Sequence, residues 1–395
     1  MADIENVKSI TIVGAGIMGH EIAQVALMGG FKPVILHDLA ADILEAASEK
    51  IGKNLKNLTK KHVLDPNQTN PDLIKNLLKE PDLQKAVSHA DYIIEAIPEI
   101  MDLKQDLFKK LGLFSPEHAI LATNTSTMSI TEIASLSGKP EKVIGCHFFT
   151  PIVVLRLIEI IRGRETSDNT VKITQEVCNK FPAIQGKLFL PVLQKESPGF
   201  IVNRLMLSTS IYLKWLLDLS IEKGIPLEEI DADVDFIANI GPFAKWDYLG
   251  LDIVYNTMKY FAEVLSPEFS PGKVLTRLVE KGNLGRKSGK GLFNWRQGKP
   301  IISKKKKAGL FNIELFMAIQ LNEGCKLLEE GIIKGYKIID DTIMAGMNLP
   351  GPFGPGKRNY QRWIGVLEDF AEESGINYVK PCNLLKTGKF LHMRK

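Results

Sequence analysis

The stretch Ser9-Ile-Thr-Ile-Val-Gly-Ala-Gly-Ile-Met-Gly19 decides the fold of the first part of the chain. Its first five residues predict a buried β-strand, and the apolar residues after Gly19 recur with the spacing of a helix. A second predicted strand, Pro33–His37, ends at Asp38, which lies 19 positions after Gly19. A glycine loop between strand and helix, with an acidic residue at that spacing, is typical of a fold that binds a dinucleotide.

Each part of this motif has a physical role. Gly14 allows the tight turn, Gly16 lets a pyrophosphate approach the backbone, and Gly19 lets the helix pack closely on the strand. The free N–H groups at the helix N-terminus attract phosphate. Asp38 accepts hydrogen bonds from ribose hydroxyls, and the lack of an arginine directly after it favours NAD over NADP. The alternative is a glycine turn without a ligand. We therefore predict that NAD is bound by Gly14, Gly16, Ile17, Met18, Gly19 and Asp38.

Composition sets broader limits. A length of 395 residues suggests two or three domains, and 45% apolar with 24% charged residues is ordinary for a globular protein. The net charge of +4 gives no reason to expect a nucleic-acid partner. Four cysteines without C-x-x-C spacing argue against a disulfide framework or a metal site and favour a reducing compartment. The apolar run Phe200–Leu219 contains three charged residues, so we expect no membrane span. Because Met1–Lys8 is short and polar and the first strand starts directly after it, we expect no signal peptide and a cytoplasmic location.

Between Asp38 and the next strand the pattern predicts two helices, 41–61 and 71–83. The first is rich in lysine and is either a solvated face or a patch for an anionic substrate handle. Its lysines are Lys50, Lys53, Lys56, Lys60 and Lys61.

Two further buried strands are predicted over 90–97 and 119–122, each followed by polar residues at its carboxyl end, where open α/β sheets bind ligands. Pro98 and Glu99 follow the first, before a helix over 102–111 that carries Lys104. The polar run Thr123-Asn-Thr-Ser-Thr-Met-Ser129 follows the second and leads into a helix over 130–135. This run either caps the helix or donates hydrogen bonds to a reacting oxygen.

Val143-Ile-Gly-Cys-His-Phe-Phe-Thr-Pro151 and Leu155-Arg-Leu-Ile-Glu-Ile-Ile161 predict two paired strands joined by a tip over 150–154. That pairing puts His147 opposite Leu157, with Glu159 one diagonal step away on the same face. A carboxylate beside an imidazole fixes its tautomer and stabilises the imidazolium. The pair is either a structural contact or an acid/base device.

After Ser197–Phe200 the chain is predicted to be helical and repeats itself at a spacing near 109 residues, which indicates a duplicated domain rather than a solenoid. The matching pairs are Asn203 and Asn312, Ile230-Asp231 and Ile339-Asp340, Phe261-Ala-Glu263 and Phe370-Ala-Glu372, and Gly241-Pro-Phe243 and Gly351-Pro-Phe353. The predicted linker, 297–308, carries Lys304–Lys307, a solvated run or a docking element. The second copy lacks a match to Gly285-Arg-Lys-Ser-Gly-Lys-Gly291.

Over nearly its whole length the sequence resembles the (S)-3-hydroxyacyl-CoA dehydrogenases. The motifs that carry the resemblance are Gly14-Ala-Gly-Ile-Met-Gly19, Glu95-Ala-Ile-Pro-Glu99, Asn124-Thr-Ser126, Gly145-Cys-His-Phe-Phe149, Ser197-Pro-Gly-Phe-Ile-Val-Asn-Arg204, Gly241-Pro-Phe243 with Asp247 and Gly250-Leu-Asp252, and Gly285–Gly291. The expected fold is an α/β Rossmann-type NAD-binding domain, 1–196, followed by two tandem all-α helical domains, 197–297 and 308–395. The helical domains are expected to form an internal pseudo-dimer, with a homodimer as a further option.

The resemblance implies an oxidoreductase of fatty acid metabolism that uses NAD to oxidise a short 3-hydroxyacyl-CoA. It assigns His147 as the general acid/base and Glu159 as its orienting partner, with Ser126 and Asn203 holding the substrate's C3 oxygen and the imidazole. Glu99, Lys104, Ser126 and Lys287 match positions that contact NAD. Lys61 matches a lysine that contacts coenzyme A, and Asn54 stands where relatives often have serine, so Asn54, Lys61 and Ser126 are the expected substrate-binding residues.

The sequence departs from the family pattern near the expected site. Thr150 replaces an asparagine and Val153 a proline, while His20 and Glu21 replace small residues. Thr150 and Val153 lie in the expected tip of the strand pair and bear on the acyl group that the site accepts. His20 and Glu21 bear on packing under the pyrophosphate. Two alternatives stay open: a related dehydrogenase acting on a sugar acid such as L-gulonate, and a non-catalytic NAD-binding protein.

Overall fold

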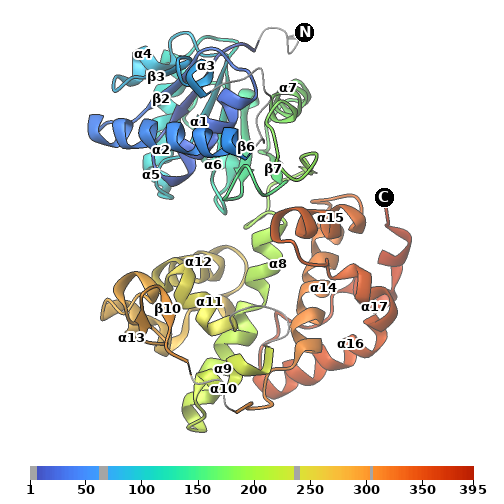
Figure 1. Cartoon of the computed structure of the whole chain (residues 1–395). Coiled ribbons are helices and arrows are strands. Elements are labelled where there is room, and N and C mark those ends of the chain that lie inside the picture. The colour runs from blue at the N-terminus through green and yellow to red at the C-terminus, as the bar shows by residue number, and fades with distance from the viewer. Residues whose placement is uncertain (1–6, 62–69, 235–240, 303–305) are drawn as a thin grey trace. The chain divides into compact units, whose positions relative to one another are not determined.

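The computed structural model describes residues 7–61, 70–234, 241–302 and 306–395, which fall into two compact units. Unit 1 takes its described residues from Met1–Val202 and Gly331–Gly351, together with Lys395. Unit 2 takes its described residues from Asn203–Glu330 and Pro352–Arg394. Figure 1 shows the sheet and its covering helices in the blue to green part of the chain and further helices in the green to red part.

The described residues of unit 1 contain an eight-stranded sheet in the order β3-β2-β1-β4-β5-β6-β7-β8. The first six strands in this order are parallel, β7 runs antiparallel to β6, and β8 is parallel to β7. The strands are β1 Ile10–Val13, β2 Val34–His37, β3 Leu77–Lys79, β4 Tyr92–Glu95, β5 Ile120–Thr123, β6 Val143–Phe148, β7 Ile158–Arg162 and β8 Val192–Leu193.

Helices cover both faces of this sheet, as parallel strands require. The core on one face joins alternate strand residues to α1, α2 and α7. On the other face Thr11 donates its hydroxyl hydrogen to Ala86 of α4, and Gly145 lies against Ile130 of α6. These helices are α1 Ile17–Met28, α2 Ala41–Lys60, α3 Asn70–Ile74, α4 Leu83–Val87, α5 Met101–Phe114, α6 Ile130–Ala134 and α7 Asp168–Asn179.

The predicted helix over 71–83 is wrong. Helix α3 ends at Ile74, and Leu77–Lys79 forms the edge strand β3, in parallel register with Val34–Leu36 of β2. Backbone bonding to an open sheet edge outweighs a weak helical preference here. The other strands predicted before residue 130 are confirmed to within three residues at each end.

The predicted register of the β6–β7 pair is also wrong, by two residues. His147 lies directly opposite Glu159 rather than Leu157. Nine residues, 149–157, join the strands because Val154 and Leu155 both donate their N–H to Pro151 at 3.0 Å, and Leu157 pairs with Phe189 instead of β6. A shift of two residues keeps each side chain on its face, so His147 and Glu159 still share one.

Helices make up most of unit 2, so the prediction of an α/β sheet domain followed by a helical C-terminal region is confirmed. Its longer helices are α8 Val202–Ser208, which starts at the unit boundary, α9 Ser210–Glu222, α11 Pro242–Leu249, α12 Leu251–Val264, α13 Gly272–Glu280, α14 Ile313–Glu329 and α16 Phe353–Ser374, with the short α10 Leu227–Asp231 and α17 Asn383–Thr387. Helix α15, Tyr336–Met347, belongs to unit 1. No helix within the described residues has the length and apolar character needed to cross a bilayer.

The predicted linker over 297–308 contains part of a short hairpin, β9 Trp295–Arg296 with β10 Lys299–Pro300. Lys304 and Lys305 lie outside the described residues. Lys306 is exposed and pairs with Glu229 at 3.3 Å.

A buried ion cluster holds unit 2 together. The Nε of Arg204 lies 2.5 Å from Oε1 of Glu323, its Nη2 lies 2.7 Å from Glu330, and the Tyr378 hydroxyl donates to Glu323 at 2.7 Å. Burial raises the pKa of Glu323, but Lys326, Arg204 and Tyr378 outweigh it, so the pKa is lowered. The Glu323 carboxylate is therefore ionised, and its burial is tolerated because Arg204 and Lys326 lie beside it.

We expect Arg204→Gln to lower the free energy of unfolding by about 3–5 kcal/mol at neutral pH, because it leaves a buried carboxylate short of its partner. Since the folded pKa of Glu323 lies below its unfolded value, its stabilising effect is present above the unfolded pKa and disappears as pH falls through the folded one. Urea unfolding followed by circular dichroism, repeated over a range of pH, measures the loss in the variant and the pH dependence of the unfolding free energy. Arg362→Gln, which removes an exposed pair with Glu314, is the control and should cost about 1 kcal/mol or less.

Candidate active site

The glycine loop between β1 and α1 has the geometry expected of a phosphate cradle. Gly14 has φ of 102°, and a Cβ there would lie 2.5 Å from the Ala96 oxygen. A Cβ at Gly19 would lie 1.7 Å from the Gly14 oxygen, whereas a Cβ at Gly16 meets nothing within 4 Å. Helix α1 starts after Gly16 with no side-chain cap and no acidic residue in its first turn. The residues present therefore fit a dinucleotide, with open space where its phosphates would approach.

Asp38 lies next to this loop at the end of β2. Its Oδ2 accepts a hydrogen bond from the Ala15 N–H at 2.9 Å. Ile17 is exposed beside the loop and Met18 is half-buried. The structure thus brings the predicted loop residues and the predicted ribose ligand together.

A buried charge network lies at the carboxyl end of β4. The ammonium of Lys104 on α5 is 2.6 Å from Glu95 and 3.2 Å from Glu99, and the Lys104 side chain is 1% exposed. Thr123 donates to the second Glu95 oxygen at 2.6 Å. The buried ammonium of Lys104 therefore contacts these two carboxylates and can affect a bound ligand only through them. Sequence reasoning assigned no role to Glu95, although its place at the end of a buried strand was a usable signal.

Glu99 gathers the polar run that follows β5. Thr125 donates to it at 2.5 Å, and Ser126 donates its backbone N–H at 2.8 Å and its hydroxyl at 3.3 Å. Burial raises the pKa of Glu99, but the Lys104 charge and these donors outweigh it and lower the pKa. Glu99 is therefore an anion at neutral pH. Ser126 lies beside it at the sheet's carboxyl edge.

The His147–Glu159 pair spans β6 and β7 in unit 1. Nδ1 of His147 lies 2.8 Å from Oε2 of Glu159, and the two side chains are 7% and 0% exposed. The other Glu159 oxygen accepts the N–H groups of Ile201 and Val202, both at 3.0 Å. Because Nδ1 faces the carboxylate, Nε2 is the nitrogen left for proton transfer, and within the described residues no hydrogen bond to it is present.

Two phenylalanines frame this imidazole, and an amide ties its strand to the neighbouring one. The Phe149 and Phe200 rings lie 4.3 and 5.6 Å from the His147 ring, centroid to centroid. Asn124 accepts the Phe148 N–H at 2.9 Å, which links the polar run after β5 to the residue next to His147. The two residues are 24 positions apart, so no local pattern predicted this contact.

The remaining predicted residues belong to helix α2 and its end and to unit 2. Lys61 is exposed directly after α2, and Asn54 is half-buried on the same helix, whose lysines are all exposed. Asn203 and Lys287 belong to unit 2, where Lys287 pairs with Asp252. Their assignment to the site stays a prediction.

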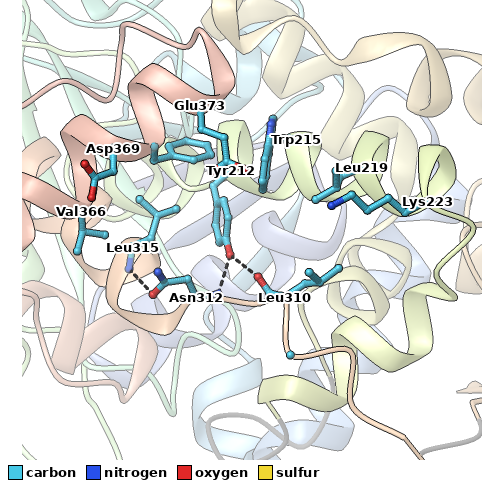
Figure 2. A pocket seen from close by; sticks show the side chains of 12 residues that line it. Tyr212, Trp215, Leu219, Lys223, Leu310, Asn312, Leu315, Val366, Asp369 and Glu373 are labelled. Atoms are coloured by element: carbon cyan, nitrogen blue, oxygen red, sulfur yellow. Dashed lines mark hydrogen bonds between the residues drawn. The ribbon is translucent and has the colours of Figure 1, made fainter.

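Unit 2 also contains a cavity of about 400 Å³ between α9, α14, α16 and the segment 309–312. Figure 2 shows the Tyr212 hydroxyl beside Leu310 and Asn312. The Asn312 N–H donates to that oxygen at 2.7 Å, and the hydroxyl donates to the Leu310 oxygen at 3.3 Å. Burial raises the pKa of Tyr212 to about 12, with the Asp233 and Glu373 charges adding to the effect. The cavity contains none of the predicted site residues.

The sheet, its glycine loop and the carboxylate-bound imidazole define an NAD-dependent dehydrogenase. Residues 9–187 match the NAD-binding domain of 3-hydroxyacyl-CoA dehydrogenase, and residues 199–295 match the C-terminal domain of the same enzymes. The chain belongs to the 3-hydroxyacyl-CoA dehydrogenase family, whose members are NAD-dependent oxidoreductases.

Individual relatives agree with this assignment. The chain is 35% identical over 288 residues to a probable 3-hydroxybutyryl-CoA dehydrogenase of Deinococcus radiodurans, covering 72% of this chain and 99% of the relative. It is 34% identical over 300 residues to the human mitochondrial hydroxyacyl-coenzyme A dehydrogenase, covering 73% and 92%. The crystal structure of 3-hydroxybutyryl-CoA dehydrogenase from Escherichia coli K12 aligns with a TM-score of 0.83 at 25% identity, over 98% of this chain and 99% of that one.

The glycine geometry predicts different outcomes for two alanine variants. We expect Gly16→Ala to change the unfolding free energy by about 0.5 kcal/mol or less and to weaken NADH binding roughly tenfold, since its methyl group enters the space where phosphate approaches. Gly19→Ala should instead destabilise the fold by about 1–3 kcal/mol, because its Cβ meets the Gly14 oxygen. Thermal unfolding and NADH fluorescence titration measure the two effects. Equal stability of both variants would contradict the packing role of Gly19.

Proposed function

We propose that this protein oxidises short (S)-3-hydroxyacyl-CoA esters, such as 3-hydroxybutyryl-CoA, to 3-ketoacyl-CoA with NAD, and catalyses the reverse reduction. The observation that carries the proposal is the buried His147–Glu159 pair, 2.8 Å apart, at the carboxyl edge of a dinucleotide-binding sheet. A binding module has no need of such a pair, and an alcohol dehydrogenase needs one group that takes a proton as hydride leaves.

His147 is the general acid/base in this proposal. Its Nε2 takes the proton of the 3-hydroxyl group during oxidation and returns it to the oxygen during reduction. NAD, when bound, accepts the hydride from C3. Glu159 positions the ring through Nδ1 and stabilises the imidazolium that forms. Because Glu159 also accepts two backbone N–H groups, its carboxylate is held against rotation.

The other residues bind and position. Ser126 and Asn203 steady the C3 oxygen and the imidazole through their dipoles. Glu99 orients Ser126 and, with Lys104 behind it, lies toward the cofactor, and Lys287 adds a cation from the helical region. Lys61 and Asn54 bind the coenzyme A portion. The exposure of all five lysines on and after α2 supports such a patch.

We also propose that the helical region is a tandem pair, 197–297 and 308–395, that packs as an internal pseudo-dimer after the NAD-binding domain, 1–196. Two matching contacts support this. Gly241 lies against Asp231, where a Cβ would be 2.3 Å from Cγ, and Gly351 lies against Asp340, where it would be 2.1 Å from Oδ1. A homodimer of whole chains and a cytoplasmic location, in keeping with four free cysteines, complete the proposal.

The acid/base assignment predicts that His147→Gln abolishes turnover with acetoacetyl-CoA while NADH binding persists, because the glycine loop is untouched. Absorbance at the nicotinamide band follows turnover, and fluorescence titration follows binding. Wild-type turnover in this variant would remove His147 from the mechanism.

Glu159→Gln should lower kcat by roughly 10²–10⁴, the usual scale for acid/base support, with little change in KM. The amide still accepts backbone N–H groups but carries no charge to stabilise the imidazolium. A circular dichroism spectrum like that of the wild type is the control for folding. A higher KM with unchanged kcat would indicate a binding role instead.

A substrate panel separates this proposal from its rivals. Purified protein is tested with acetoacetyl-CoA, longer 3-ketoacyl-CoAs and L-gulonate. Activity confined to CoA esters supports the proposal, and activity on gulonate alone supports a sugar-acid dehydrogenase. No activity on any of them, with NADH still bound, supports a non-catalytic role.

A further inference from the structure

Glu21 ties helix α1 to the first half of the β6–β7 connection. One of its oxygens lies 2.9 Å and the other 3.0 Å from the Thr150 hydroxyl, and the second also accepts the Ile152 N–H at 2.9 Å. Thr150 and Ile152 follow Glu21 by 129 and 131 positions, so only the folded chain brings them together. Hydrogen bonds to an ionised carboxylate are among the stronger ones in proteins.

The segment that Glu21 anchors starts beside the proposed acid/base residue. Phe149 lies with its ring centroid 4.3 Å from that of His147, and Thr150 is the next residue. Ile152, at the other end of the segment, is 4% exposed and belongs to the core beneath α1. A shift of Thr150 would therefore be transmitted to the Phe149 ring and to the wall of the site around His147.

The second half of the same connection has tethers of its own. Ile184 donates its N–H to the Val153 oxygen at 2.9 Å, and Phe189 donates to the Arg156 oxygen at 2.7 Å. Releasing Glu21 would therefore loosen residues 149–152 while residues 153–157 stay attached. The effect of such a release is local to the side nearer His147.

Glu21 lies on the helix whose N-terminus, after Gly16, has the features of a phosphate site. The same helix thus serves the cofactor at its start and holds the connection beside His147 one turn later. Glu21 and Thr150 are in direct contact, so the start of this helix and the start of the connection are joined by one side-chain pair.

We propose that Glu21 is a positioning residue that fixes the segment 149–152 beside His147 and thereby restricts the site to short acyl groups. This inference rests on the proposed function, because it names what limits the acyl group in that same site. Thr150 and the Ile152 N–H are the groups through which Glu21 acts. With the contact broken, the segment moves away from the core and the site accepts longer chains.

Three variants test the contact. Glu21→Gln keeps the shape but removes the charge and one of the two acceptor oxygens. Thr150→Val removes the hydroxyl, and Thr150→Ser keeps it. Glu165→Gln, at an exposed glutamate of unit 1, is the control for loss of a carboxylate. For each, kcat and KM are measured with acetoacetyl-CoA and 3-ketooctanoyl-CoA, and NADH affinity is measured by fluorescence.

We expect the ratio of kcat/KM for the short over the long ester to fall roughly tenfold in Glu21→Gln and in Thr150→Val. Thr150→Ser and Glu165→Gln should keep the wild-type ratio, and NADH affinity should stay within about twofold throughout. In the double variant, Glu21→Gln with Thr150→Val, the ratio should fall little beyond either single variant, because both remove one shared contact.

The outcomes separate this inference from the function on which it rests. Wild-type protein inactive on both esters contradicts the proposed function. An active wild type whose ratio is unchanged in Glu21→Gln and Thr150→Val overturns the inference alone. Equal losses on both esters, or additive effects in the double variant, also overturn it, since a general loss of stability would produce them.

Discussion

The structure of the candidate site depends on one buried carboxylate. Glu159 is fully buried, and a charge in that position is costly unless hydrogen bonds replace the lost water. It has three partners: the His147 imidazole and the N–H groups of Ile201 and Val202. The imidazole comes from the neighbouring strand β6, and the two N–H groups come from the chain that leaves the sheet. One side chain thus fixes both the ring and the path of the chain beside it.

That path has a visible conformational cost. Gly199 and Phe200 both have positive φ, 75° and 56°, and a bulky residue rarely adopts this region. The turn aims two successive N–H groups at Glu159 and places the Phe200 ring 5.6 Å from His147. Strain of this kind persists where surrounding contacts over-determine it, and here those contacts are the ones that hold the imidazole.

The sequence predicted the site better than it predicted the backbone around it. The glycine loop and Asp38 follow from a local pattern, and the structure places them together because strand, turn and helix are consecutive. His147 and Glu159 were placed on one face despite a register error of two residues, since side-chain direction repeats every two residues. Strand β3 was missed because its pairing depends on a sheet edge and not on its own residues. The Asn124–Phe148 and Glu21–Thr150 contacts join distant segments, so spacing along the chain could not reveal them.

The helical region contains two Gly-Pro-Phe turns, which we propose to be matching parts of two copies, and these parts can be compared. Asp231 and Asp340 each lie against the glycine of a Gly-Pro-Phe turn, so both proposed copies share that contact. The loop 285–295 belongs to the first proposed copy, and there Asp247 accepts the N–H groups of Leu292 and Phe293 and the indole N–H of Trp295. Burial raises the pKa of Asp247 against the effect of these donors.

With the one-residue slip, the matching position of the second copy is the exposed Lys357. On the proposed tandem arrangement, the second copy forms its helices without a counterpart of this loop or of the buried Asp247. The helices of the helical region thus do not all depend on a loop of this kind. Lys287, for which we propose a contact with the cofactor, lies on that loop.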